Sequence, residues 1–314
     1  MFRSLLVPLD GSRFGEQALP LAFAIARHAG ASVELFHVHA PMADAHPEFA
    51  PFLKDEGVRG QLKSRRQVYL EGLMERAKTV SAVPLRCALR EGPIADTIRA
   101  QVAAKGIDLV VMTTHGRGAL GRFLLGSVAD ALVRDLPVPL LLVHPTEAGP
   151  DLSQETRLQR ILVPLDGSAI AEEMLQPAVS LARVMAASVL LLRVVRPIVL
   201  GDASLEGAAA GQVPQRLFEE LQAYETEVLH SARQYLDTIA AKLRDRELQV
   251  ETAVLLDDAP AVAIVDEAGR RQIDLLALAT HGRRGLARFF LGSVADKVIR
   301  TAPQPVLVYR PGQK

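Results

Sequence analysis

Short apolar runs alternate along the chain with longer segments in which apolar residues recur every three or four positions. A short run that ends at Gly, Pro, Asp or Ser is typical of a buried strand, and a spacing of three or four is typical of a helix. In the first half, the expected strands cover residues 3–9, 32–40, 83–92, 108–114 and 137–145. The expected helices cover residues 14–28, 58–80, 93–105 and 127–135. Pro20 lies inside the first of these helices and predicts a kink there.

The second half of the chain repeats the first. SLLVPLDGS at residues 4–12 returns as RILVPLDGS at residues 160–168, a shift of 156 positions. THGRGALGRFLLGSVAD at residues 114–130 returns as THGRRGLARFFLGSVAD at residues 280–296, a shift of 166. The extra length of the second copy therefore lies in its middle, where we expect a loop and then a longer helix within residues 201–245. The best-matching segments are turns and loops, whereas a repeat kept only for packing would let its loops drift.

The order of these elements predicts the fold class. Strands that are apolar on both faces and alternate with helices indicate a parallel sheet with helices on both sides. With right-handed crossovers, five such strands predict an α/β sandwich of flavodoxin-like or Rossmann-like type in each half. We expect two tandem domains, at residues 1–146 and 159–314, joined by a polar linker at residues 147–158.

Composition narrows the classes of function. Lys and Arg number 36, as do Asp and Glu, so no basic surplus points to nucleic acid or an anionic membrane. Aromatic residues make up 4% with no Trp, which weakens any base-stacking surface. The single cysteine, Cys87, excludes a disulfide within the chain. No segment reaches 18 uninterrupted apolar residues, so we expect no membrane span and a cytoplasmic location.

The loop after the fourth strand carries the most informative chemistry. An open parallel sheet binds ligands outside the carboxyl ends of its strands, where this loop lies. Gly126 has no Cβ and can bring the backbone close to a ligand. Ser127 and Val128 then begin a helix, so their amides point outward from the positive end of the helix dipole and form an anion site. Arg117 and its counterpart Arg283 add positive charge nearby.

A purely structural interpretation of the same loop stands beside this one. Ser127-x-x-Asp130 and Ser293-x-x-Asp296 match the capping box, in which a serine and an acidic residue satisfy the free amides of the helix themselves. The glycines would then only shape the turn. The loop sequence alone favours neither the anion site nor the capping box.

Taken together, these residues resemble the universal stress proteins in their tandem two-domain form. The resemblance rests on V-P-L-D-G-S after the first strand, D-L-V-V-M in the fourth, and T-H-G-R-G followed by L-L-G-S-V-A-D. It implies a five-stranded α/β sandwich of the adenine nucleotide alpha hydrolase-like type. The nucleotide-binding branch of that family carries Gly-x-x-Gly, nine residues, and then Gly-Ser or Gly-Thr, and it binds ATP. The other branch lacks this loop and does not bind ATP.

The resemblance also assigns roles to positions in both halves. It implies that Asp10 and Asp166 face the ribose or the adenine. The implied adenine slot consists of Pro8, Val38 and Met112 with Pro164, Val194 and Leu278. The implied phosphate site consists of Gly116, Gly126, Ser127 and Val128 with Gly282, Gly292, Ser293 and Val294. The remaining members of the expected binding set are Leu9, Thr113, Arg117, Leu165, Ala279 and Arg283.

The chain departs from the family pattern at one position of the loop. Thr113 and Ala279 stand where the motif has its first glycine. If phosphates pass close to that backbone, each Cβ lowers the affinity, and the branched Thr113 lowers it more. We therefore expect the second site to be at least as competent as the first.

Other repeated residues have plainer interpretations. His115 recurs without a carboxylate or thiol partner at metal-ligand spacing, so we expect it to fix a turn. Glu16 and Glu172 lie early in the first helix of each half, where a negative charge suits the helix dipole. We assign no catalytic and no metal-binding residue, and expect Asp10 to contact adenosine rather than a phosphate-bound Mg²⁺.

Three functions remain open on the sequence. The first is a stress-response or regulatory module that holds ATP, ADP or AMP, with or without Mg²⁺, and is at most a very slow ATPase. The second is a hydrolase of the bound nucleotide, and the third a structural module that binds no nucleotide and acts through association. We favour the first, because no repeated pair supplies an activated nucleophile or a base that positions water.

The last strand of each half predicts how the halves associate. Both are apolar and both end a sheet, and unpaired sheet edges seek partners. We expect residues 138–143 to pair with residues 304–309 inside one chain as a pseudo-dimer. A homodimer of whole chains is a further option.

Overall fold

The computed structural model describes residues 2–39, 56–115, 125–153, 155–198, 215–245, 247–280 and 292–311. The strands of the first half are β1 (Ser4–Leu9), β2 (Ser32–His39), β3 (Leu85–Glu91), β4 (Leu109–Thr113) and β5 (Leu140–Val143). Its helices are the 3-10 helix η1 (Gly15–Ala18), α1 (Leu19–Ala29), α3 (Glu56–Val80), α4 (Ile94–Lys105) and α5 (Ser127–Asp135). All five strands expected there are therefore present.

The second half repeats this order. Its strands are β6 (Arg160–Pro164), β7 (Ser188–Val195), β8 (Val250–Leu256), β9 (Leu275–Ala279) and β10 (Val306–Tyr309). Its helices are α6 (Ala169–Glu173), α7 (Leu175–Met185), α9 (Gln215–Arg244), α10 (Pro260–Arg270) and α11 (Ser293–Thr301). With 30 residues against 25, α9 is longer than α3, as expected.

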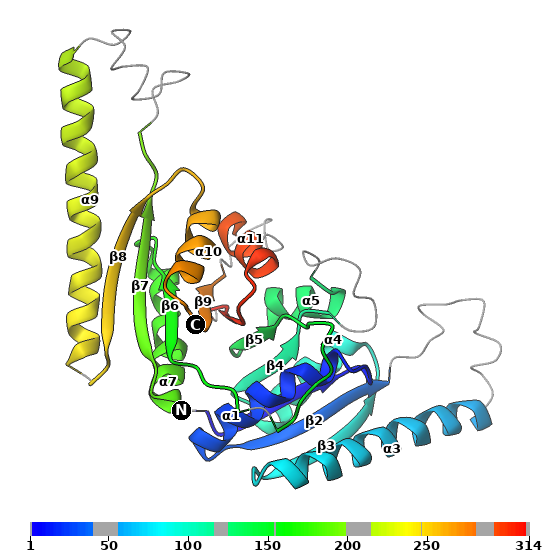
Figure 1. The fold of residues 1–314 in the computed structure, drawn as a ribbon. Helices are drawn as coiled ribbons and strands as arrows, with labels where there is room; N and C mark the ends of the chain where they lie inside the picture. Colours follow the sequence, from blue (N-terminus) through cyan, green and yellow to red (C-terminus); the bar gives the residue numbers. More distant parts are fainter. Residues whose placement is uncertain are drawn as a thin grey trace.

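The strands of both halves form one sheet of ten, in the order β3-β2-β1-β4-β5-β10-β9-β6-β7-β8 (Figure 1). Neighbours within each half run parallel, with the Rossmann-like order that places the first strand between the second and the fourth. The halves join where β5 and β10 pair antiparallel, with Leu141 opposite Leu307. The expected contact between residues 138–143 and 304–309 is confirmed.

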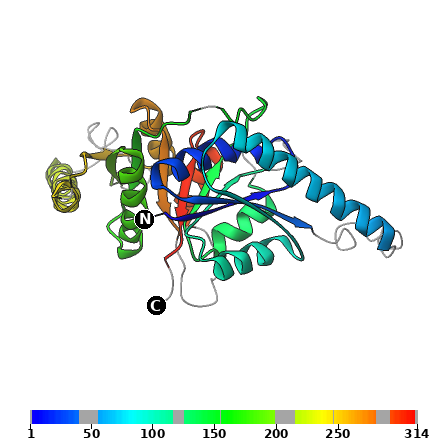
Figure 2. The same cartoon turned by 90° about the horizontal axis from the view of Figure 1, so that it is seen from below.

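Helices cover both faces of this sheet, and an apolar core lies under each layer. One core packs α1, α3, α7 and α9 against the sheet, and the other packs α4, α5, α10 and α11. Each core contains residues from both halves, and α1 touches α7 across the junction. The two long helices, α3 and α9, lie at opposite ends of the molecule (Figure 2).

The expected kink at Pro20 does not occur. The segment begins as the 3-10 helix η1, and Pro20 is the second residue of α1. In the first turn of a helix the amide hydrogen that proline lacks has no partner to lose, so Pro20 begins a helix instead of bending one.

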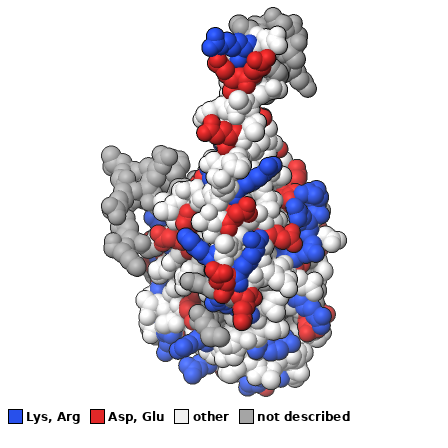
Figure 3. Space-filling view, turned by 90° about the vertical axis from the view of Figure 1, so that its left-hand side faces the viewer, with Lys and Arg blue, Asp and Glu red and all other residues white. Residues whose placement is uncertain are grey.

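Charge is spread evenly over the face that carries α9. Acidic and basic side chains are interspersed there, without one dominant sign (Figure 3). In the part of the chain that the structure describes, no helix is long and apolar enough to cross a membrane.

Candidate functional site

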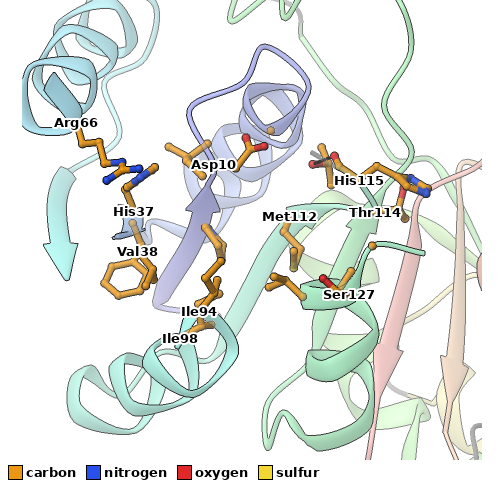
Figure 4. Close-up of a pocket in the computed structure, with 18 residues that line it drawn as sticks. Asp10, His37, Val38, Arg66, Ile94, Ile98, Met112, Thr114, His115 and Ser127 are labelled. Atoms are coloured by element: carbon orange, nitrogen blue, oxygen red, sulfur yellow. Dashed lines mark hydrogen bonds between the residues drawn. The ribbon is translucent and has the colours of Figure 1, made fainter. Parts of the chain in front are cut away.

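The carboxyl ends of β1, β2 and β4 face the start of α5 and enclose a cavity of about 360 Å³ (Figure 4). Residues that the sequence predicted for the first site line it: Pro8, Leu9, Asp10, Val38, Met112, Thr113, Gly126, Ser127 and Val128. Gly116 and Arg117, predicted for the same site, lie outside the described residues. The fold thus brings together segments that are separated by more than 100 positions in the sequence.

One wall of the cavity is apolar. Val38 and Met112 belong to it as predicted, and Phe36, Ile94 and Ile98 join them. Ile94 and Ile98 lie one turn apart at the start of α4. Ile94 is 37% exposed, unusual for a large apolar side chain, and its place on the cavity accounts for this. The wall is suited to the flat face of an aromatic ring.

The sequence did not predict three polar residues of the cavity, His37, Arg66 and Thr114, and it predicted His115 only for a turn. Arg66 reaches in from α3, where its guanidinium contacts the ring of His39 and points toward His37 (Figure 4). The repeat gave no hint of Arg66, because the position 166 residues later, in the second copy, is Ala232.

Asp10 is held in a tight turn at the end of β1. Its carboxylate accepts hydrogen bonds from the Ser12 amide at 2.9 Å and from the Ser12 hydroxyl at 2.7 Å. Gly11 takes a φ of 82°, a left-handed conformation that favours glycine. Gly15 leaves room for the carboxylate, because a Cβ there would lie 2.6 Å from Asp10 Oδ1. The turn fixes the acidic group on the wall of the cavity.

The start of α5 tests the capping-box interpretation of the serine loop. Gly126 is the N-cap, and no side chain among the described residues caps the helix. The Asp130 carboxylate turns away from the helix start and accepts from Arg134 at 2.9 and 3.0 Å. The capping-box interpretation is therefore wrong here. The first amides of α5 have no acceptor among the side chains that the structure describes, and Ser127 and Val128 line the cavity.

The second half arranges its serine in the same way. Gly292 is the N-cap of α11, again without a side-chain cap among the described residues. The Asp296 carboxylate accepts from Arg300 at 3.0 and 3.1 Å instead of closing a capping box. A pattern that fits the capping box twice thus forms it in neither half.

The end of β4 is shaped by hydrogen bonds to the chain itself. The Thr113 hydroxyl donates to the His115 carbonyl at 2.9 Å, and the Thr114 hydroxyl lies 2.9 Å from His115 Nδ1. The Gly126 amide donates to the Thr114 carbonyl at 2.9 Å, and a Cβ on Gly126 would lie 3.0 Å from that oxygen. His115 fixes a turn, as expected, and burial, followed by nearby His144 and Arg300, lowers its pKa.

The predicted residues of the second half lie at the corresponding strand and helix ends. Pro164 ends β6, Leu165 and Asp166 follow it, and the Asp166 carboxylate accepts from the Ser168 amide at 2.9 Å. The others that the structure describes are Val194, Leu278, Ala279, Gly292, Ser293 and Val294. Gly282 and Arg283 lie outside the described residues. The aspartate turn is thus formed twice.

Comparison with known proteins agrees with this repeated arrangement. A family model described as the universal stress protein family matches residues 1–144 and again residues 157–310. The chain belongs to the universal stress protein family. It carries two copies of the family domain in tandem, and its place in that family makes it a stress-response module.

Individual universal stress proteins support the tandem arrangement. One from Mycolicibacterium smegmatis is 28% identical over 313 residues, covering 98% of this chain and 97% of its own length. One from Thermus aquaticus is 33% identical over 145 residues, covering 46% of this chain and 100% of its own. A crystal structure from Archaeoglobus fulgidus superposes with a TM-score of 0.65 at 17% identity, covering 99% of this chain and 97% of its own. The likeness to this last protein shows the shared fold.

Both stress-protein domains tie their first helix to their long helix through an acidic residue. The Glu16 carboxylate is 6% exposed and pairs with Arg76 of α3 at 2.9 Å, close to Tyr69. The Tyr235 hydroxyl of α9 donates to Glu172 at 2.9 Å, and burial together with this carboxylate raises the Tyr235 pKa. These glutamates therefore hold helices together, which goes beyond the dipole role that the sequence suggested.

Proposed function

We propose that this chain binds adenine nucleotide, with ATP as the expected ligand, and acts as a regulatory stress-response module rather than as an efficient enzyme. One observation carries the proposal: the first cavity joins an apolar slot to a helix start that no side chain of the described residues caps. An apolar wall suits a purine ring, and the open amides at the positive end of a helix suit phosphate. A single ligand that needs both is a nucleotide.

Each part of the ligand would then meet a fixed part of the protein. The base would lie against Val38 and Met112, which belong to the apolar wall. A carboxylate oxygen can accept more than one hydrogen bond, and a ribose hydroxyl would donate to Asp10, which lines the cavity. The phosphates would accept from the amides at Ser127 and Val128, where the dipole of α5 favours negative charge.

Mg²⁺ fits this proposal as a companion of the phosphates. Within the described residues, no three His, Cys, Asp or Glu side chains lie together in the way metal ligands do. The ion would therefore be bound mainly by phosphate oxygens and water, as Mg²⁺ commonly is.

Among the described residues, the polar groups at the ends of β1 and β4 form hydrogen bonds with neighbouring parts of the chain. Asp10 is held by Ser12, and the hydroxyls of Thr113 and Thr114 bond to His115. A general base must instead reach a proton of the attacking water. We therefore expect hydrolysis on the order of once per minutes to hours, far below usual enzyme turnover.

The experiment uses Ser127→Asp. An acidic residue in the first turn suits the dipole of α5, so the fold should keep its melting temperature, whereas a phosphate would be repelled. For the wild type, ATP at 100 times Kd should stabilise the protein by about 2.7 kcal/mol, and Ser127→Asp should lose most of this shift. Ser293→Asp then measures the part that the second half contributes. A wild-type protein that ATP, ADP and AMP all fail to stabilise would refute the proposal.

A structural module without nucleotide is the second candidate, and the continuous ten-stranded sheet favours it. In that case the loops would be relics and association would be the function. Within one chain, β5 and β10 already cover each other, which leaves β3 and β8 as the outer strands for a homodimer. Light scattering with and without ATP separates the two: a stable dimer with no nucleotide response would favour this candidate.

A further inference from the structure

We infer that the two halves bind nucleotide with unequal affinity, because the arginine near the expected site comes from the long helix in the first half and from the sheet in the second. The inference rests on the proposed function and adds which half binds. Position 37 in β2 corresponds to position 193 in β7, and position 66 in α3 corresponds to position 232 in α9. The first half has His37 and Arg66 at these positions, and the second half has Arg193 and Ala232.

In the first half the guanidinium comes from the long helix. Arg66 and His37 both line the cavity, and Arg66 enters from α3 beside the ring of His39. The cation thus lies at the end of the cavity that β2 forms, beside His37 (Figure 4).

In the second half the guanidinium comes from the sheet and lies across the aspartate turn. The Nη1 and Nη2 atoms of Arg193 are 3.3 Å from the place where a Cβ on Gly167 would be. The same guanidinium lies over the Tyr235 ring, 5.1 Å from its centroid. Ala232, at the position of Arg66, is 1% exposed and offers no polar group. Arg193 thus connects α9 to the turn that carries Asp166.

This placement bears on the adenosine end of the second site. In the first half, His37 at the corresponding position lies on the cavity wall. The longer side chain of Arg193 starts from the same place in the second half and reaches the turn at Gly167, beside the expected ligand. A nucleotide that used Asp166 would have to displace a guanidinium that lies over the Tyr235 ring and beside Gly167. At the corresponding position the first half has the shorter side chain of His37.

The sequence of the loop led us to expect a second site at least as competent as the first, and the inference from Arg193 contradicts this expectation. Ala279 in place of Thr113 favours the second half at the phosphate end. The Thr113 hydroxyl, however, is directed to the His115 carbonyl at 2.9 Å, which turns its polar group back onto the chain. Arg193 acts at the adenosine end, where the bound ligand would have to replace a whole side chain. We therefore assign the tighter site to the first half.

Calorimetric titration of the full chain with ATP tests this through a rescue. The wild type should bind one ATP per chain, and Asp10→Ala should bind none. The double variant D10A/R193H, which gives the second half the histidine of the first, should bind one ATP again. Because the double variant regains a function, misfolding cannot produce the expected result.

The possible outcomes separate the two proposals. A wild type that binds no nucleotide ends the proposed function and this inference together. A wild type that binds two, or an Asp10→Ala variant that keeps one site of unreduced affinity, overturns this inference and leaves the proposed function standing. Failure of D10A/R193H to bind, with a circular dichroism spectrum matching the wild type, overturns the role of Arg193. His37→Arg should weaken ATP binding about tenfold or more, and an unchanged affinity would also count against it.

Discussion

The junction between β5 and β10 should make the two halves unfold as one unit. Leu141 and Leu307 face each other across it, both are 0% exposed, and both belong to a core that contains residues from either half. Leu141→Ala removes three carbon atoms from this core. At about 0.8 kcal/mol for each, the lost transfer free energy is about 2.4 kcal/mol, and the cavity left behind raises the expected cost to about 3 kcal/mol.

The measurement combines two observations. Urea unfolding followed by circular dichroism should show one transition, displaced to lower urea in Leu141→Ala. Hydrogen exchange read by mass spectrometry then compares β1 with β6. Although the substitution lies in the first half, both strands should lose protection by the same free energy, because they open in the same event.

The control is Leu217→Ala on α9, where the side chain is 39% exposed and the expected cost is within about 0.5 kcal/mol. Two transitions in the wild type would refute the reasoning, as would unchanged protection of β6 in Leu141→Ala. A cost below about 1 kcal/mol would show that the junction repacks or was loosely packed.

Three further outcomes are expected. Burial lowers the pKa of His115 and His144 from the ordinary 6.5, so both stay neutral when folded while the unfolded chain takes up protons. Stability should therefore be full above about pH 6.5 and fall below it, less steeply in His144→Gln; an equal fall in urea titrations would contradict this. Tyr235→Phe removes the 2.9 Å bond to Glu172 and should cost about 1 kcal/mol in urea unfolding, and an unchanged midpoint would contradict that contact. Gly126→Ala keeps an ordinary φ of −62° but places a Cβ 3.0 Å from the Thr114 carbonyl, so calorimetry should show ATP affinity reduced about tenfold, and unchanged affinity would argue against a ligand there.

Local patterns in the sequence predicted most of the fold. Strand cores are short apolar runs, and their ends are marked by Asp-Gly-Ser or by glycine, so the elements could be read one at a time. The pairing of β5 with β10 was predictable because each is an apolar strand at the edge of its half of the sheet, and an unpaired edge strand tends to pair with another strand. Pro20 was misplaced, because a helix pattern does not reveal that its first residues form a 3-10 turn before the α-helix starts.

The cavity was predictable where it consists of strand ends and loops. Asp10 and Ser127 belong to repeated segments, and the topology of a parallel sheet brings such segments to one edge. Ile94 and Arg66 could not be predicted in this way. Each lies on a helix, and which face of a helix reaches a site depends on how the whole helix packs against the sheet. Arg66 also has no counterpart in the repeat, so comparing the copies conceals it.

The serine loop shows why a sequence pattern could not settle the function. Ser127-x-x-Asp130 is compatible with a capped helix and with an anion site, and the choice depends on where the Asp130 carboxylate goes. It pairs with Arg134 one turn later and lies 3.7 Å from Arg300 of the other half, so it is engaged at the junction. Because the carboxylate serves the contact between α5 and α11, the start of α5 stays open. The contact that joins the halves and the open amides proposed to bind phosphate thus follow from the same aspartate.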